Sequence, residues 1–427
     1  MAKRLLVVAY DLAPLDVISS QRVNYFVEFF SSIGLEVDVI TSKKHPVDGP
    51  LTDTSAFKRL SRAATIYQID YMPRFLRGEK EADRPLPNKE SKKRNFLKKI
   101  KPMLIKLFGA FFDHRTLWAV KCLRFLRRHT INHRYDYVLT SSLPVSVNLV
   151  GWYLQRNNAA HYWVADFRDL WSRNHLIPYS AFSRSFDSFI EKFFLKRSDL
   201  ISTVSESLKA DMVSLHGIPG LVVMNGLVAR DYQNLVADYA FFDALDCNKK
   251  VNIVYAGSLY AERRNPAPLL KMLIMSSERE NFAIHFFGPD ADEIKRLLPD
   301  IDLSDLCFFH GRRPRSDVLA IQKAASLNMF LESGEPDAKG VITGKLFELI
   351  AMGRPVLSIG PKSDFESVRI LSSSTLLIRW EDIGEFGVQE LAARACLPTQ
   401  PSKNIIDKFS RRKMCEELWC QMEKSCH

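Results

Sequence analysis

The sequence has few of the features that mark several large classes of protein. Its seven cysteines form no C-x-x-C pair and no ligand-like spacing with histidine, which predicts reduced thiols and no zinc or disulfide framework. No apolar run reaches the roughly 18 residues that span a bilayer, and the start, MAKRLLVVAYDLAP, predicts a buried strand instead of a signal peptide. No nucleic-acid-binding motif is present. We therefore expect a protein that is soluble or lies on a membrane, with no metal, no other cofactor and no nucleic-acid partner.

The stretch GVITGKLFELIAMGRPV (340–356) lacks what a phosphate-binding P-loop requires. One residue too few separates Gly340 from Gly344, and Leu346 stands where a P-loop has Ser or Thr to hold magnesium. The stretch instead predicts a turn at Thr343 and Gly344 followed by a helix that ends at a glycine and a proline. The N-terminus of such a helix suits an anion, with Lys345 beside it and Glu348 one turn further on. An ordinary core helix capped by Thr343 would explain the same pattern.

Charge and length indicate two domains of different character. A chain of 427 residues is too long for one ordinary core. Its formal net charge is +11, but residues 1–230 hold 35 Lys and Arg against 21 Asp and Glu, and the remainder holds 25 against 28. The net charge is therefore +14 in the first part and −3 in the second, so only the first part is basic.

Short apolar runs alternate with helical patterns along the whole chain. This alternation predicts an α/β fold of parallel sheets covered by helices, and the pattern restarts after a polar stretch at 230–250. We expect two Rossmann-like domains, residues 1–226 and 227–402, and a C-terminal helix at 403–427 that packs back on the first. Parallel sheets bind ligands at the carboxyl ends of their strands, so a central cleft is expected where the two sheets face each other.

A basic amphipathic insertion is expected at residues 72–115. Within 92–106 there are seven Lys and Arg and no acid, and the apolar residues of 96–111 fall near one helical face. A segment of this kind suits an anionic membrane surface, which we assign to residues 92–112. A helix that packs between domains and exposes a basic face is the alternative.

The segment YAGSLYAERRNPAPLL (255–270) places a glycine turn and two arginines between a predicted strand and a predicted helix. Gly257 and Ser258 would let the backbone approach a phosphate, and Arg263 or Arg264 could bind two of its oxygens at once. This pattern favours a phosphate site, although many strand-to-helix loops carry an arginine.

The segment HYWVADFRDLW (161–171) is an apolar strand with charged residues at its end. It delivers Asp166, Arg168, Asp169 and Trp171 to the carboxyl end of the predicted sheet. Charges are costly to bury without a purpose, so this cluster favours a cleft site.

A pair of acids, Asp290 and Asp292, follows another predicted strand. Such a pair holds a divalent metal in some transferases, but acids in the first turn of a helix also complement the helix dipole. We predict the helix-start role and no metal site.

In order along the chain, these motifs resemble the GT-B glycosyltransferases, in particular the family-4 type of retaining enzymes that use nucleotide sugars. The resemblance covers nearly the whole chain. The pieces are SQR (20–22), GLEVDVIT, DFRDLW, SDLISTVSESL, VMNG, YAGSLY-x-x-R and KLFELIAMGRPV.

The resemblance implies roles for individual residues. Glu348 matches the second Glu of the family's E-x7-E motif, which bonds the donor ribose, and Arg263 or Arg264 matches a basic residue on the diphosphate. Lys345, Thr343 and Gly344 lie beside that position, as does the loop before Ser20. Asp166 matches a cleft residue near the acceptor or the transferred sugar. We therefore assign catalysis to Asp166, Arg263 and Lys345, donor binding to Gly257, Ser258, Arg264, Thr343, Gly344, Glu348 and Ser20, and acceptor contact to Arg168, Asp169 and Trp171.

Two departures concern the sugar. The first Glu of E-x7-E would be residue 340, which is glycine, so Glu332 or Glu335 must replace it. The loop APLDVISSQR also lacks the family's paired glycines.

The resemblance implies a hexosyltransferase of polysaccharide or glycolipid biosynthesis that moves a sugar from a nucleoside diphosphate sugar to a lipid-linked acceptor with retention. We expect it in the cytoplasm, peripheral on the inner face of the plasma membrane. A sugar-nucleotide epimerase on the same fold is one alternative, and a membrane- or polyanion-binding protein without enzymatic activity is another.

Overall fold

A computed structural model describes most of the chain. The described residues are 2–15, 18–43, 53–71, 106–107, 109–113, 115–129, 134–174, 177–228, 230–259, 263–299, 301–395, 397 and 403–424. The chain divides into two compact units, Met1–Val223 with Cys415–His427, and Met224–Met414.

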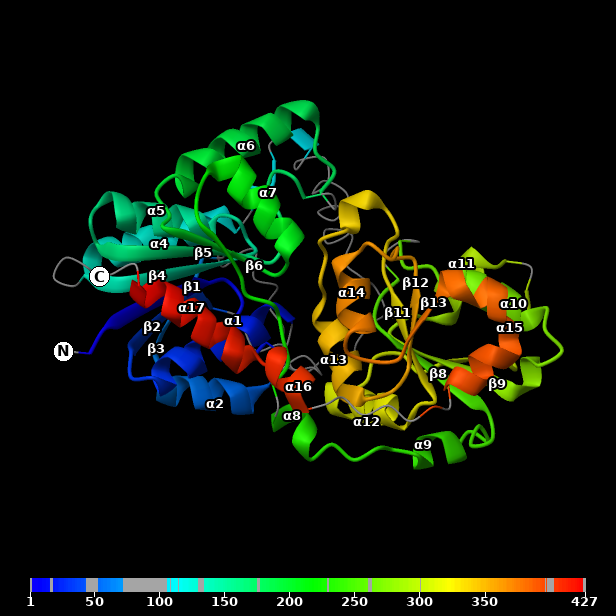
Figure 1. The fold of residues 1–427 in the computed structure, drawn as a ribbon. Coiled ribbons are helices and arrows are strands. Elements are labelled where there is room, and N and C mark those ends of the chain that lie inside the picture. Colours follow the sequence, from blue (N-terminus) through cyan, green and yellow to red (C-terminus); the bar gives the residue numbers. More distant parts are fainter. Residues whose placement is uncertain are drawn as a thin grey trace, which may run out of the picture. The chain divides into compact units, whose positions relative to one another are not determined.

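The first unit is built on a seven-stranded parallel sheet in the order β3-β2-β1-β4-β5-β6-β7 (Figure 1). Its strands are β1 (Arg4–Ala9), β2 (Glu36–Ser42), β3 (Thr65–Ile69), β4 (Tyr135–Ser142), β5 (Ala160–Phe167), β6 (Leu200–Thr203) and β7 (Gly220–Val222). Its helices are α1 (Ile18–Ser32), α2 (Thr54–Ala63), α4 (Thr116–His129), α5 (Val147–Arg156), α6 (Ala181–Leu195) and α7 (Glu206–His216). Strands and helices alternate along this part of the chain, as the sequence predicts.

The second unit is built on a six-stranded parallel sheet in the order β10-β9-β8-β11-β12-β13. Its strands are β8 (Val251–Ala256), β9 (Phe282–Phe287), β10 (Cys307–Phe309), β11 (Leu327–Leu331), β12 (Val356–Ile359) and β13 (Leu377–Arg379). Its α-helices are α8 (Arg230–Gln233), α9 (Ala240–Asp243), α10 (Ala267–Ile274), α11 (Ala291–Leu297), α12 (Arg315–Ala324), α13 (Gly344–Met352), α14 (Glu366–Ser372), α15 (Trp380–Ala395) and α16 (Lys403–Lys408). Two 3-10 helices, η2 (Arg279–Asn281) and η3 (Pro336–Ala338), complete it.

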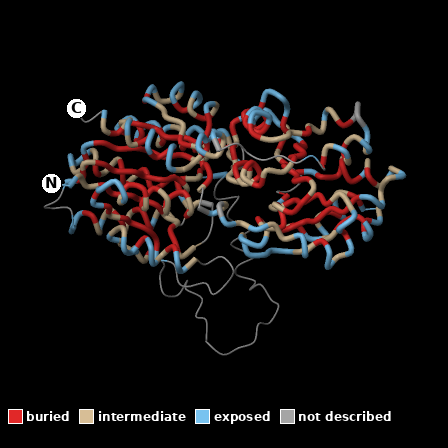
Figure 2. Tube along the Cα trace, turned by 60° about the horizontal axis from the view of Figure 1, so that its bottom comes forward, coloured by how far each residue is buried: buried red, intermediate tan, exposed pale blue. Residues whose placement is uncertain are grey.

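Both sheets are buried because helices cover both of their faces. Strands β5 and β9 are buried along nearly their whole length, which explains their continuous apolar sequences. Figure 2 shows buried residues running through the interior of each unit. In the first unit Trp118, Trp163 and Trp171 are completely buried in the core.

In each sheet the strand order reverses beside the first strand of the unit. The chain runs from β1 outward to β3 and then returns to β4 on the other side of β1, and β8 and β11 repeat this arrangement. Such switch points leave room for a ligand at the carboxyl ends of the two adjacent strands. The two switch points are therefore the places where the fold positions a site.

The C-terminal segment differs from the single helix that its sequence pattern predicts. It forms α16 and then α17 (Arg411–Lys424), because Ser410 between them bridges to Leu227. The unit boundaries lie at residues 223 and 414, compared with the expected 226 and 402. Within the first unit, Trp419 of α17 contacts Phe30 of α1 and Tyr137 of β4.

The predicted basic insertion is only partly described. Residues 72–105, 108 and 114 lie outside the described residues, and with them most of the predicted membrane segment 92–112. Within the part of the chain that the structure describes, each helix is too short or too polar to cross a bilayer.

Candidate functional site

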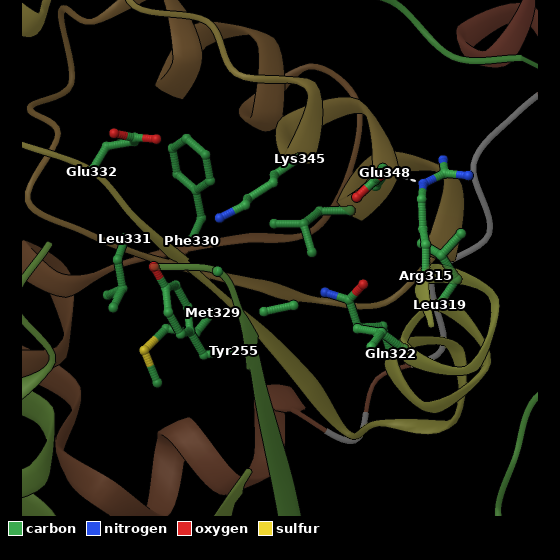
Figure 3. A pocket seen from close by; sticks show the side chains of 14 residues that line it. Tyr255, Arg315, Leu319, Gln322, Met329, Phe330, Leu331, Glu332, Lys345 and Glu348 are labelled. Atoms are coloured by element: carbon green, nitrogen blue, oxygen red, sulfur yellow. Dashed lines mark hydrogen bonds and ion pairs between the residues drawn. The ribbon is translucent and has the colours of Figure 1, made fainter. Parts of the chain in front are cut away.

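A pocket lies at the switch point of the second sheet, where β8 and β11 end (Figure 3). Strand ends form its floor, and α12 and α13 supply the remaining walls. Its lining residues are Tyr255, Ala256, Gly257, Arg315, Val318, Leu319, Gln322, Met329, Phe330, Leu331, Glu332, Lys345, Glu348 and Leu349. The walls are mainly apolar, and the charged groups come from the end of β11 (Glu332), from α12 (Arg315) and from α13 (Lys345 and Glu348). This is the composition expected of a small-molecule site.

Lys345 projects into this pocket from the first turn of α13. Its ammonium group forms no hydrogen bond or ion pair with any described residue, and it lies 5.7 Å from the ring centre of Tyr255. Burial, followed by the charge of Arg264, lowers the pKa of Lys345 to about 8, although Glu332 and Glu348 oppose the shift. A cation that is poorly hydrated and lacks a direct partner will attract an anion.

Gly257 allows the lysine to reach its position. The φ of Gly257 is +153°, and a Cβ at this residue would stand 1.8 Å from Nζ of Lys345. Any side chain here would displace the ammonium group. The predicted glycine turn after β8 is thus required by the lysine beside it.

Arg264 and Glu332 form a buried ion pair at the edge of the pocket. Nε of Arg264 donates to Oε2 of Glu332 at 3.1 Å, and Nη2 donates to Oε1. Burial raises the pKa of Glu332, against the lowering influence of Arg264. Arg264 also donates to the carbonyl of Ser258 at 3.4 Å, so the pair fixes the turn after β8.

Of the two predicted arginines, the structure brings Arg264 next to Lys345. Arg263 is 40% exposed and forms a long ion pair of 3.8 Å with Asp337, outside the pocket lining. Of the two glutamates that could replace the missing first Glu, Glu332 lines the pocket and Glu335 is exposed before η3. The geometry therefore favours Arg264 over Arg263 and Glu332 over Glu335.

The N-terminus of α13 has the form that the sequence predicts. Thr343 is the N-cap residue, Gly344 opens the helix, and Gly353 closes it in the left-handed conformation at φ +62°. The Thr343 hydroxyl makes no capping bond, and its buried oxygen has no hydrogen-bond partner among the described residues. This hydroxyl and the N–H groups that open α13 can together bind an anion.

Glu348 is held by a residue that the sequence analysis missed. Nε of Arg315, at the start of α12, donates to Oε1 of Glu348 at 2.7 Å, and the same guanidinium contacts Asp231 and the Tyr232 hydroxyl. Oε2 of Glu348 accepts no hydrogen bond from a described residue, so this carboxylate oxygen can accept a bond from a ligand. The sequence RRPR (312–315), which leads into α12, indicated a group of arginines, but it did not show which of them contacts Glu348.

The VMNG motif has a structural role in this unit. Nδ2 of Asn225 donates to the carbonyl of Ile342 at 3.3 Å, and its own carbonyl accepts a bond from Arg411 at 2.7 Å. Asn225 thereby tethers the residues that lead into α13.

The acid pair after β9 starts a helix, as predicted. Asp290 is the N-cap of α11 and forms a capping box with Glu293, and Asp292 lies in the first turn. No group of three or more metal-ligating side chains occurs among the described residues.

At the switch point of the first sheet, the structure corrects the role predicted for Asp166. Its carboxylate is completely buried and accepts bonds from Arg22 at 2.6 and 3.1 Å, Ser141 at 2.8 Å and Ser202 at 2.7 Å. Burial alone would raise its pKa, but Arg22 and the two serines hold the pKa below its ordinary value. Asp166 therefore fixes β4, β5, β6 and α1 together and has no free surface for a substrate.

Two more predictions in the first unit are corrected by burial. Trp171 is completely buried, stacks on Phe111 with ring centres 6.0 Å apart and donates to Asp187 at 3.1 Å, so it is a core residue. Ser20 is also completely buried, and its hydroxyl donates to the carbonyl of Leu15. Neither side chain can contact a ligand in this conformation.

Arg168 and Asp169 remain partly exposed at the carboxyl end of β5. Nε of Arg168 donates to the carbonyl of Ser142 at 3.0 Å, and burial lowers the pKa of the guanidinium. These two side chains keep the accessibility that a role in acceptor contact requires.

Comparison with known proteins gives a fold and no sequence family. No protein-family model and no curated protein matches this sequence. A sucrose-phosphate synthase from Thermosynechococcus elongatus is similar in structure with a TM-score of 0.64 and 14% identity, covering 99% of this chain and 100% of that chain. HepE from Anabaena, in complex with UDP and glucose, has a TM-score of 0.59 and 10% identity, with 99% and 100% covered.

A variant of TarM from S. aureus, in complex with fondaparinux, α-GlcNAc-glycerol and UDP, is also similar. Its TM-score is 0.56 at 11% identity, covering 98% of this chain and 99% of that chain. These likenesses confirm the predicted fold: the chain has the GT-B architecture of two Rossmann-like domains with parallel sheets.

Proposed function

We propose that this protein is a retaining glycosyltransferase of the family-4-like, hexosyl-transferring type, which moves a sugar from a nucleoside diphosphate sugar to a lipid-linked acceptor. The observation that carries the proposal is Lys345: an ammonium group without a direct partner, at the switch point of the second sheet and beside the N-terminus of α13. The fold supports it, because UDP is bound in structures of HepE and TarM that share the architecture.

The chemistry of transfer explains why cations gather here. The bond between the sugar carbon C1 and the diphosphate oxygen breaks, and its electron pair goes to the diphosphate. The acceptor oxygen forms the new bond to C1 on the same face, and its proton passes to a diphosphate oxygen. Preorganised positive groups lower the energy of the departing anion.

Three groups of α13 would bind the diphosphate in this proposal. Lys345 supplies a charge, the first turn supplies N–H groups, and the Thr343 hydroxyl supplies an unused donor. Glu348, oriented by Arg315, would accept bonds from the ribose hydroxyls. Glu332, paired with Arg264, would face the sugar hydroxyls in place of the missing first Glu.

The acceptor would bind to the first unit. Arg168 and Asp169 stay accessible there, and the +14 charge of residues 1–230 suits an acceptor held at an anionic membrane. We place the enzyme on the inner face of the plasma membrane, in polysaccharide or glycolipid biosynthesis.

Calorimetric titration with UDP, GDP, dTDP, CDP and ADP tests the proposal. We expect one of these to bind, and Glu348→Ala to weaken that binding by about tenfold or more, because a hydrogen bond to a charged group is lost. Glu335→Ala is the matched control: this glutamate is exposed outside the pocket, and its removal should leave the affinity unchanged. Absence of binding by all five nucleotides would contradict a donor site in this pocket.

The nucleotide that binds then selects the sugar nucleotides for an activity assay. Transfer to a membrane-embedded acceptor should exceed transfer to a soluble analogue. Release of a new sugar nucleotide in the absence of any acceptor would instead indicate an epimerase.

A further inference from the structure

The helices α4, α5 and α6 form a layer on one side of the first sheet, where α4 packs on α5 and α5 packs on α6 (Figure 1). We call their outward surface the basic face. Its exposed charged residues are all cationic, namely Arg124, Arg127, Arg128, Arg156 and Lys192, and Lys196 and Arg197 follow directly after α6.

No acid of these three helices is exposed. Helices α4 and α5 contain no Asp or Glu, and the two acids of α6, Asp187 and Glu191, are 0% and 1% exposed. Asp187 is turned inward to Trp171, Tyr179 and the backbone of Ala110, and Glu191 to Ser172 and His216. The basic face therefore has no internal neutralisation by the acids of its own helices.

Large apolar side chains stand among these cations. Phe182 and Phe189 are 72% and 70% exposed and lie two turns apart on one side of α6, with Phe193 next to them at 38%. Phe112, 53% exposed, stacks on Phe186 of the same helix with ring centres 5.6 Å apart. Among the described residues, the phenylalanines that are at least 38% exposed all lie in this region.

The opposite side of the same sheet is different. There α17 exposes Glu416 and Glu417 beside Arg412 and Lys413, and Trp419 is turned inward onto Phe30 and Tyr137. Mixed charges without exposed aromatic rings are the usual solvated surface. The contrast shows that the basic face is not a general property of this unit.

We propose that the basic face docks on an anionic lipid bilayer, with Phe182, Phe189 and Phe193 inserted at the level of the headgroups. The cations complement the negative charge of the membrane surface, and the phenylalanine rings move from water to the boundary between headgroups and acyl chains. The ammonium group of Lys196 lies 5.2 Å from the ring centre of Phe193, which joins the two kinds of contact in one place.

This surface lies on α4, α5 and α6, and of the segment 92–112 that the sequence suggested it includes Phe112. The inference rests on the proposed function only in taking a membrane as the partner, and it concerns binding alone. Another copy of the chain would present like charges to this face, which opposes close association.

Co-sedimentation of the full chain with phosphatidylcholine vesicles, with and without phosphatidylglycerol, tests the proposal. We expect the wild type to bind the anionic vesicles and to be released by salt. The double variant Phe182→Ser/Phe189→Ser should bind them about tenfold or more weakly, because two exposed rings are removed. Lys192→Gln/Lys196→Gln should also bind less, with no change on neutral vesicles.

The matched control is Val236→Ser/Met275→Ser, which removes two apolar side chains of the second unit that are 79% and 88% exposed. It should bind like the wild type. Equal binding by the phenylalanine variant and the wild type would overturn the proposal. Loss of binding in the lysine variant alone would identify a charge-only polyanion surface, such as one for nucleic acid, and would also overturn it.

Nucleotide titration of the same variants separates this inference from the proposed function. The phenylalanine variant should bind nucleotide as the wild type does, because its substitutions lie in the first unit and the pocket lies in the second. If the protein bound vesicles through α6 but bound no nucleotide, this inference would stand and the proposed function would be contradicted. Self-association that disappears in the phenylalanine variant, without vesicle binding, would assign the face to a second copy.

Discussion

The two sheets carry charged residues at equivalent switch points but use them in opposite ways. At the first, Asp166 is completely buried and its carboxylate is satisfied by Arg22, Ser141 and Ser202. At the second, Lys345 lies in a pocket with no hydrogen bond or ion pair to a described residue, and its pKa is lowered to about 8. The charge of Asp166 holds strands together, whereas the charge of Lys345 is available to a ligand.

The comparison teaches that a charge at a strand end is not by itself evidence of a ligand site. What separates the two cases is whether the charged group already has its partners. A buried carboxylate with four donors gains little from a further contact, whereas a poorly solvated cation without a partner gains much. Of the two switch points, the second is therefore the one where we expect an anionic ligand to bind.

The largest expected effect is on stability, at Asp166. Asp166→Ala removes the carboxylate that faces the buried guanidinium of Arg22, and we expect the free energy of unfolding to fall by about 3–5 kcal/mol. Urea denaturation followed by circular dichroism measures this. Asp169→Ala, at the same strand end but partly exposed, should cost less than about 1 kcal/mol. If Asp166→Ala and Asp169→Ala had equal free energies of unfolding, the structural role inferred for Asp166 would be wrong.

A smaller effect is expected at Lys345, and on binding instead of stability. Lys345→Met should weaken nucleoside diphosphate binding by about 10- to 100-fold, because a charge-assisted hydrogen bond is lost. The free energy of unfolding should not fall, since burial disfavours the charged form that the variant removes. Calorimetry and urea denaturation of the same sample test both statements, and Lys362→Met, at an exposed lysine of the same unit, serves as control. If Lys345→Met lowered the free energy of unfolding and left the nucleotide affinity unchanged, Lys345 would be a structural residue, as Asp166 is.

The smallest effect is a dependence of binding on pH. Lys345 is charged below its pKa of about 8 and neutral above it, so an anion should bind best at lower pH and lose affinity as the pH rises through 8. Between about pH 7 and about pH 9 the loss should approach tenfold, with proton uptake on binding. Lys345→Arg, which stays charged, should show a flat profile. A wild-type affinity that does not change over this range would show that Lys345 is not the group that binds the anion.

The fold was predictable because its signals are local. Most strands of both sheets lie in short, mainly apolar runs, and α13 is bounded by Gly344 and Gly353, whose effects on the backbone act within a few residues. The helix start at Asp290 and Asp292 is a local feature too, and the structure confirms this prediction and adds the capping bond of Asp290.

The site was predictable only in part because its contacts join distant residues. Asp166 and Arg22 are 144 positions apart, so the pair that buries the carboxylate leaves no pattern in the sequence around either residue. Arg315 finds Asp231 at a separation of 84 positions for the same reason. Trp171 lies in a polar stretch of the sequence, but its ring packs against the rings of Phe111 and Phe194, which lie elsewhere in the chain. Whether a side chain is accessible to a ligand depends on such contacts between distant residues, and the neighbouring sequence does not indicate them.

The place of α17 has a consequence for the order in which the protein assembles. The chain leaves the first unit at Val223, builds the whole of the second, and returns only at Cys415. During synthesis, Phe30 and Tyr137 emerge from the ribosome long before the indole of Trp419 that covers them. The second unit, Met224–Met414, must be synthesised before Trp419 of α17. Until then, the aromatic surface of Phe30 and Tyr137 in the nascent first unit remains uncovered.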